Sequence, residues 1–472
     1  MQFPILNNRG IALPMVLGLI VIITLLGFTA MSLADNQTLM VNRYQQQEKA
    51  LHYAEAGVYK YLNLLNADRD FYKSQESNEL QNIDVAFESG FYRLTVIPPT
   101  TSNPVVTIRS TGWTKSHPDI KRTVEVTVNK KEFVQTLYGS GREINDKGNE
   151  VWWARGDVVD GPLHTNGSLY IDGTGGDGST GPVFNGPVTY VEGLTLKKGT
   201  EQFNGGPPQK VDPLIFPPTN SSLKTLAKKG GYYYEGRTCI HINGNELVIR
   251  NKNDAAERSK PLPANGVIYV DGGTGGKWDN NTGNVFVSGT LDGRLTIAAA
   301  NDIYITAWDP TNWEEPIDNV PRGTYTGGLY YKDFNGSNIA DIDDMLGLIA
   351  GGYVRILHNN WPRDDGRSWS TNDVAPDVAP KNITIHAAIF ALNNSFEYEY
   401  YNSGAAKDTI TLIGSITQNK RGAVGTYNGQ RTVTGYNKNY SHDPRMLYDM
   451  PPHFLEPVNS GWEIRSWREV NS

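Results

Sequence analysis

The most apolar segment of the chain lies close to its N-terminus. Residues 11–34 contain 24 residues without a charged side chain. Because a helix needs about 20 apolar residues to cross the hydrocarbon core of a bilayer, this segment predicts a transmembrane helix. Arg9 is the only charged residue before it, so the positive-inside rule leaves the N-terminus in the cytoplasm and the remaining chain outside. A cleavable secretory signal, with Ala30 and Ser32 imitating its cleavage site, is the alternative.

Helical periodicity continues beyond this apolar segment. No glycine or proline interrupts residues 35–56. Apolar residues then follow at spacings of three and four, which places them on one face of a helix: Leu51, Ala54, Val58, Tyr61 and Leu65. We therefore expect one long helix over residues 11–66, whose second half packs on a folded domain.

The next segment alternates between apolar and polar residues. Strand positions with a period of two recur three times between residues 92 and 128, separated by turns rich in Pro, Ser and Asn. This pattern predicts a small antiparallel sheet over residues 67–139. A similar alternation near Trp462 predicts that the C-terminal segment 458–472 returns to this sheet as a last strand.

Residues 140–457 consist of short apolar runs interrupted by glycine and asparagine. The densest run is Gly289 to Thr306, GTLDGRLTIAAANDIYIT. Glycine adopts positive φ at sharp corners, and asparagine tolerates it. Short strands joined by such corners favour stacked coils that bury a shared core. We expect a mainly β protein in which this region is a right-handed parallel β-helix, with a β-sandwich as the alternative.

Composition narrows the class of protein further. The 472 residues include 49 glycines and 26 prolines, and 38% are hydrophobic, which excludes a mainly disordered chain. The formal net charge of −7 shows no overall basic excess of the kind typical of nucleic-acid binding proteins. Cys239 is the only cysteine, so internal disulfides are excluded. Its apolar neighbours predict a buried thiol.

The N-terminal residues carry a family resemblance. A short leader, residues 1–10, ends Arg9-Gly10, an apolar helix starts at Ile11, and Ala54-Glu55-Ala56-Gly57 follows. This combination resembles type IV pilin-like proteins, specifically PilX-type minor pilins. The central region resembles a β-helix domain fused to such N-termini, a layout shared by large competence minor pilins.

The resemblance implies a maturation and assembly route. In that family a prepilin peptidase cuts after the residue equivalent to Gly10 and methylates the new terminus, here Ile11. The protein would cross the inner membrane once before assembly, with its C-terminal domain extracytoplasmic, and would reach the cell surface in a pilus or enter a secretion pseudopilus. Its partners would be the peptidase, the inner membrane and other pilin and minor pilin subunits. Ala54, Glu55 and Gly57 would belong to the assembly region.

Met15 departs from the pattern of the major pilins. It occupies the fifth mature position, where a glutamate is usual in that family. Such a glutamate can pair with the charged amino terminus of the subunit above it. A subunit with no neighbour above needs no such partner, which predicts a position at the fibre tip. The alternative is that Met15 merely improves the membrane anchor.

Two groups of residues are candidates for ligand binding. A basic, tyrosine-interleaved stretch suits phosphates and stacked bases, and hence DNA; its members are Lys420, Arg421, Arg431, Tyr436, Lys438, Tyr440 and Arg445. Trp308 and Trp361 lie in loop-like sequence and suit surface glycans. An ordinary solvated edge is the alternative for the basic stretch.

Catalytic and metal signals are weak. No serine occupies a nucleophile-elbow context and the histidines are scattered, so we expect no catalytic residues, no enzyme activity and no cofactor. A polysaccharide-active β-helix enzyme, secreted or membrane-anchored, is the alternative, and its candidate residues are Lys332, Asp341, Asp343 and Asp344. A loop with oxygen ligands suits a structural calcium ion; its residues are Asp172, Thr174 and Asp177.

Overall fold

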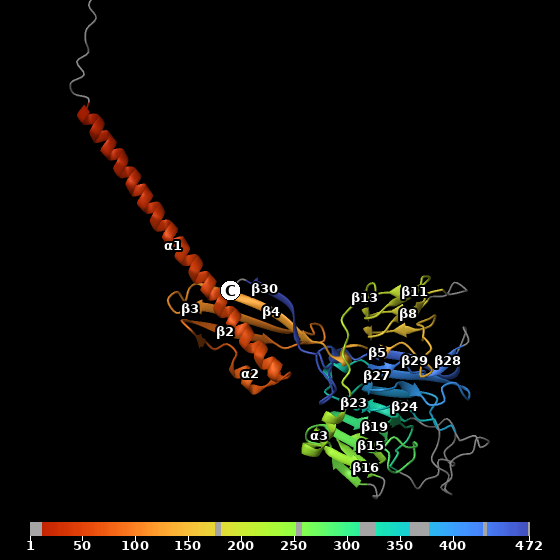
Figure 1. Cartoon of the computed structure of the whole chain (residues 1–472). Helices are drawn as coiled ribbons and strands as arrows, with labels where there is room; N and C mark the ends of the chain where they lie inside the picture. The colour runs from red at the N-terminus through yellow and green to blue at the C-terminus, as the bar shows by residue number, and fades with distance from the viewer. Residues whose placement is uncertain are drawn as a thin grey trace, which may run out of the picture. The chain divides into compact units, whose positions relative to one another are not determined.

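The chain forms two compact units. The computed structural model describes residues 12–174, 181–251, 257–311, 327–358, 377–427 and 432–470. The first unit contains residues 12–99, 105–129 and 462–470, and the second contains the described parts of 100–104 and 130–461. Figure 1 shows their elements coloured along the chain. Gly10, Ile11, Asp177, Trp361 and Arg431, which the sequence singled out, lie outside the described residues.

A single long helix opens the first unit. Helix α1, Ala12–Ala67, is continuous over 56 residues, which corresponds to a length of about 84 Å. Every described residue in 12–45 is exposed, whereas burial begins near Gln46. An apolar segment within α1 is long enough to cross a membrane, and none of it is buried in the chain. The predicted long helix is confirmed, and its first half fits a membrane anchor.

The second half of α1 packs on a five-stranded sheet with the order β1-β2-β3-β4-β30. Its strands are β1 Val85–Phe87, β2 Gly90–Ile97, β3 Val106–Thr114, β4 Lys121–Lys130 and β30 Trp462–Val470; η1 Phe71–Lys73 and α2 Gln75–Glu79 precede them. The pairs β1–β2, β2–β3 and β3–β4 are antiparallel. Alternate residues of β2 and β4 face the helix, since Leu94, Val124 and Val126 are at most 1% exposed.

The C-terminal strand β30 forms one edge of this sheet beside β4. Arg468 ion-pairs with the buried Glu125 of β4, and Arg122 pairs with Glu469. Trp462 donates its indole N–H to the carbonyl of Leu65 in α1, at 2.9 Å. These contacts hold the two ends of the chain in one folded unit.

The second unit is mainly β. Its elements before residue 240 are η2 Phe133–Gln135, β5 Tyr138–Arg142, β6 Val158–Val159, β7 Leu163–Thr165, β8 Leu169–Asp172, β9 Val183–Phe184, β10 Val188–Tyr190, β11 Leu194–Lys197, β12 Gln202–Phe203, β13 Gln209–Lys210, α3 Ser221–Gly230, β14 Tyr232–Glu235 and β15 Thr238–Gly244. Those that follow are β16 Glu246–Asn251, β17 Glu257–Pro261, β18 Val267–Asp271, β19 Val285–Leu291, β20 Arg294–Ala299, β21 Ile303–Ile305, β22 Gly328–Tyr331, η4 Ile339–Asp341, β23 Met345–Ala350, β24 Val354–Ile356, β25 Ile383–Ala391, β26 Phe396–Tyr398, β27 Ala406–Lys420, β28 Gly425–Tyr427, β29 Thr432–His442 and η5 Pro444–Leu447.

The longest row in this unit is parallel throughout its described pairs. It runs β14-β18-β20-β23-β25-β27-β5-β7-β10-β13. Two further parallel rows are β15-β19-β22-β25 and β21-β24-β26. The prediction of a mainly β region is confirmed, and most of its described strand pairs are parallel, with antiparallel pairs at β15–β16, β16–β17 and β28–β29. Such rows differ from the antiparallel sheets of the β-sandwich alternative, while the right-handed β-helix itself stays a prediction.

The order of strands in the long row differs from their order along the chain. Strand β5 pairs with β27, and β7, β10 and β13 then extend the row in one direction. The next strand along the chain, β14, lies at the opposite end of the row. The chain then returns strand by strand to β27. The sequence predicted a domain boundary between residues 139 and 140, which would divide β5. In the structure, β5 belongs wholly to the second unit.

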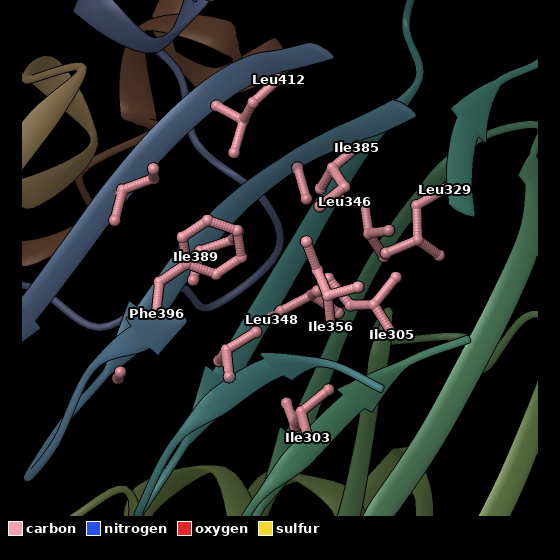
Figure 2. Close-up of a cluster of buried hydrophobic side chains, with 14 of the residues drawn as sticks. Ile303, Ile305, Leu329, Leu346, Leu348, Ile356, Ile385, Ile389, Phe396 and Leu412 are labelled. Atoms are coloured by element: carbon pink, nitrogen blue, oxygen red, sulfur yellow. The ribbon is translucent and has the colours of Figure 1, made fainter. Parts of the chain in front are cut away.

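Aliphatic residues at matching register positions form the core between these rows. Ile297, Leu348 and Ile389 occupy successive strands of the long row. Leu329 of β22, Ile385 of β25 and Leu412 of β27 are register partners in the same way. Figure 2 shows such side chains gathered between the strands, and all of these are fully buried. Each strand buries too little apolar surface alone, so stacking of neighbours supplies the core.

Candidate functional site

A pocket of about 540 Å³ lies in the second unit. Its walls come from three segments: the loop within residues 145–158, the segment 421–427 that includes β28, and the start of β29; Tyr401 contributes from a fourth. The sequence-predicted residues Arg421, Tyr436 and Lys438 all line it. The volume falls within the range of about 300–1,000 Å³ that is typical of small-ligand sites.

Arg421 forms part of the pocket floor. Its guanidinium lies 3.6 Å from the ring centroid of Trp153 and donates to the Glu143 carboxylate at 3.1 Å and to the Val151 carbonyl at 3.3 Å. Burial by itself would lower the pKa of Arg421, but Glu143 and its other neighbours raise it above its ordinary value. The guanidinium is thus a fixed, fully charged group.

Asp157 lies between two cations of the pocket. Lys438 Nζ is 3.3 Å from Asp157 Oδ1, Arg421 Nη2 is 3.9 Å from Oδ2, and the Ala154 N–H donates to Oδ2 at 3.0 Å. Burial alone would raise the pKa of Asp157, but Lys438 and Arg421 outweigh it and lower the pKa. The carboxylate is therefore ionised at neutral pH and balances Lys438.

Aromatic side chains complete the pocket wall. Tyr427 in β28 is 50% exposed, and Trp152 and Tyr401 are half-buried. The Lys197 ammonium lies 4.0 Å from the ring centroid of Trp152. Tyr401 is held by its carbonyl, which accepts a hydrogen bond from Thr434 Oγ1 at 2.6 Å. Tyr427 thus offers an accessible ring at the pocket.

Much of the basic, tyrosine-interleaved stretch is buried. Arg421, Tyr436, Tyr440 and Arg445 are all buried, at 8% exposure or less. Burial of these aromatic rings and charged groups follows from their places at inward positions of the strands or in ion pairs. These four residues therefore form no exposed basic patch, and DNA binding by the stretch stays a prediction.

Three of the candidate ligand-binding residues do not line the pocket: Arg445, Lys420 and Trp308. Arg445 pairs with Asp443 at 2.6 Å and donates to the Ile342 carbonyl at 2.8 Å. Lys420 pairs with Asp146 at 3.3 Å. Trp308 packs against the small cluster around the buried Cys239. Cys239 is fully buried, which confirms the predicted buried thiol, and burial raises the pKa of this thiol.

Asp172 and Thr174, from the predicted calcium loop, contact each other. The Asp172 carboxylate accepts from Thr174 Oγ1 and from Lys197 Nζ, the latter at 2.8 Å. The hydrogen bonds from Lys197 and Thr174 lower the pKa of Asp172 to about 2. Lys197 therefore already neutralises this carboxylate. Among the residues that the structure describes, His, Cys, Asp and Glu form no cluster of three or more that could hold a metal.

Several of the residues predicted for an enzyme site have structural partners. Asp344 is buried and accepts from the backbone N–H groups of Gly293, at 2.7 Å, and Asp333, at 3.2 Å. Lys332 forms its ion pair with Asp292, which is not one of the acids predicted with it. Asp344 thus holds two turns together, whereas Asp343 is 84% exposed and pairs with Arg294 at 3.4 Å.

Two of the four residues expected in assembly are internal. Ala54 and Gly57 are buried against the sheet of their own unit. A Cβ on Gly57 would collide with the side chains of Ser110 and Tyr92, so glycine permits this close approach. Glu55 is half-buried, and Met15 is 73% exposed.

Sequence patterns missed the pocket because its parts are far apart in the chain. Asp157 and Tyr401 carry no local signal for a shared site, and long-range contacts such as the pairing of β5 with β27 bring their segments together. The nearest local signal for the pocket in the sequence was the pair Gly422 and Gly425, which line it beside Tyr427.

Comparisons with known proteins find similarity only among solved structures. No family model and no curated protein matches the chain. The crystal structure of the competence-associated pilin ComZ from Thermus thermophilus matches over 90% of this chain and 97% of the ComZ chain, with 12% sequence identity and a TM-score of 0.31. An overlap at this TM-score does not establish a shared fold.

Proposed function

We propose that this protein is a minor pilin of a type IV pilus or pseudopilus, which carries a large β domain for ligand capture. The observation behind this proposal is the division of α1. Its described residues 12–45 are exposed, while Ala54, Val58 and Tyr61 are buried against a sheet. A bare apolar helix in water is costly at about 25 cal/mol per Å² of apolar surface. This half of α1 therefore needs an apolar environment that the described part of the chain does not supply.

Two apolar environments, one after the other, would bury this half of α1. The first is the inner membrane, since the apolar stretch exceeds the length of about 20 residues that spans a bilayer. The second is a bundle of equivalent helices from other pilin subunits, in which apolar faces pack together. The close approach of α1 and β3 at Gly112 holds the helix against the sheet. The same helix thus serves first as a membrane anchor and then as a filament contact.

The second unit supplies a surface for capture. We propose that its parallel rows close into a right-handed β-helix, whose stacked strands form a rigid support for loops. The second unit would serve either adhesion to surface glycans or capture of DNA. The pocket at Tyr427 and Lys438 is the candidate binding site.

The maturation step tests the proposal. Co-expression with a prepilin peptidase, followed by mass spectrometry of the N-terminus, should show cleavage after Gly10 and a methyl group on Ile11. Gly10→Val should block this cleavage, whereas the neighbouring Asn7→Ala should not. An uncleaved wild-type chain, or cleavage near Ala30, would refute the pilin assignment.

The position in the fibre has a separate test. Met15 lacks the carboxylate that would pair with a charged terminus above it, so we propose that the subunit caps the fibre and starts its assembly. Immunogold labelling of isolated fibres should mark one end. Labelling along the shaft would show that Met15 improves the anchor instead.

A further inference from the structure

The pocket in the second unit combines ring faces with groups that bond to hydroxyls. Tyr427 is 50% exposed, and Trp152 and Tyr401 stand in the same wall. Thr432 and Asn437 add a hydroxyl and an amide, and Asp157 and Lys438 add a charged acceptor and donor. Aromatic rings present an apolar face to C–H groups. Such a wall matches a molecule that has both C–H faces and many hydroxyls.

The charges around the pocket cancel. Glu143 compensates Arg421 from below, and Asp157 compensates Lys438 at the rim. The other two charged lining residues among those described, Glu150 and Arg155, have opposite signs. Binding to a polyphosphate depends on cations that replace the counterions of the ligand. Cations already matched by carboxylates serve this purpose poorly.

We propose that this pocket binds a neutral saccharide, with Tyr427 as the stacking ring and with Asp157 and Lys438 as hydrogen-bonding partners of its hydroxyls. Adhesion is then the use of the second unit, and DNA capture becomes the alternative outcome. This inference rests on the proposed function for its biological setting, because an anchored extracytoplasmic subunit would meet surface glycans. The binding itself depends on the second unit alone.

The positions of these residues suit this role. Asp157 is fixed by the Ala154 N–H, so its carboxylate keeps one orientation. Thr426 and Thr434 bond to each other across β28 and β29 at 2.6 Å, and this holds the strand that carries Tyr427. A site with fixed polar groups loses little conformational entropy on binding.

The test uses the full chain in a polyoxyethylene detergent, because detergents with sugar headgroups would compete for the pocket. Calorimetric titration with cellotriose, maltotriose and chitotriose supplies the neutral probes. Trigalacturonate and single-stranded oligothymidylate supply the acidic ones. We expect at least one neutral probe to bind, with affinity nearly unchanged between about 50 mM and about 200 mM salt, over which a ligand held by phosphate contacts loses orders of magnitude.

Two variants localise the binding. Tyr427→Ala should weaken the bound neutral probe by about tenfold or more. Tyr400→Ala is the matched control, since Tyr400 is 56% exposed in the same unit but does not line the pocket. Lys438→Met should weaken binding while leaving it independent of salt. Thermal unfolding of each variant shows whether the fold is intact.

Three results would overturn the inference: no neutral probe binds, oligothymidylate or trigalacturonate binds more tightly with a steep dependence on salt, or Tyr427→Ala and Tyr400→Ala affect affinity equally. These results leave N-terminal processing untouched. An uncleaved N-terminus, in turn, would refute the pilin assignment and leave the titrations valid. The two proposals can therefore fail separately.

Discussion

Arg421 and Glu143 form a buried ion pair with a hydrogen bond of 3.1 Å between Nη1 and Oε2. Their side chains are only 3% and 1% exposed. Glu143 also accepts from the indole N–H of Trp153 at 3.0 Å and from Ser140 Oγ at 2.5 Å. The pair therefore belongs to a network that joins the segment after β27 to the segment after β5, and it supports the pocket from below.

Removal of Arg421 should be costly. In Arg421→Met the Glu143 carboxylate would remain buried without its cation, and loss of one partner of such a pair costs about 3–5 kcal/mol. Lys420→Met is the control, because its ion pair with Asp146 is more exposed and such pairs contribute about 0–1 kcal/mol. Chemical denaturation should show a larger loss of unfolding free energy for Arg421→Met than for Lys420→Met. Equal losses of stability would show that Glu143 is compensated by another group.

Substitution of Gly112 should displace α1 from its sheet. A Cβ at this position would overlap the Ala50 carbonyl oxygen and the Ala54 nitrogen, both of which are backbone atoms. Gly112→Ala should therefore destabilise the first unit by about 1–3 kcal/mol, the usual cost of overpacking. Gly461→Ala is the matched control, since a Cβ there meets nothing within 4 Å. Equal melting temperatures of the two variants in thermal unfolding would contradict the close packing of α1 on β3 at Gly112.

His386 should make the protein sensitive to mild acid. It is 5% exposed, and its Nδ1 accepts a hydrogen bond from the Tyr331 N–H at 3.0 Å. Burial lowers its pKa to about 4, while the nearby Asp443 and Arg445 act in opposite directions. The unfolded chain takes up this proton near pH 6.5. Stability from neutral His386 is therefore present above about pH 6.5 and is lost as the pH falls toward 4, by about 3 kcal/mol.

The variant His386→Gln tests this pH dependence, because an amide oxygen can still accept from Tyr331. Its loss of unfolding free energy between about pH 7 and about pH 4.5 should be smaller than that of the wild type by roughly 2 kcal/mol. The partly exposed His241 offers the control variant His241→Gln. An unchanged acid sensitivity in His386→Gln would assign the effect to other groups.

Chelation should leave the melting temperature unchanged. Lys197 already pairs with Asp172 at 2.8 Å, so a calcium ion would have to displace an ammonium group. Scanning calorimetry with EDTA, and separately with added calcium, measures this directly. If EDTA lowered the melting temperature and calcium reversed the change, this result would support the calcium site predicted from the loop.

Local patterns predicted the elements of the first unit well. The apolar stripe of α1 is buried at Ala54, Val58, Tyr61 and Leu65, because a helical period directly selects one face. Alternation likewise identified the buried positions of β2 and β4. The candidate site was predicted less well, since the spacing of basic residues after Lys420 does not show which of them turn inward.

The sequence by itself determined the long anchor helix, the mainly β character of the remainder and the buried state of Cys239. These properties depend on periodicity and apolar content within short windows. Only the tertiary structure decided that β27 pairs with β5, that β13 and β14 lie at opposite ends of one row, and that Arg421, Asp157 and Tyr427 share a pocket. Strand partners distant in sequence are chosen by the packing of whole faces, and no local pattern carries that information.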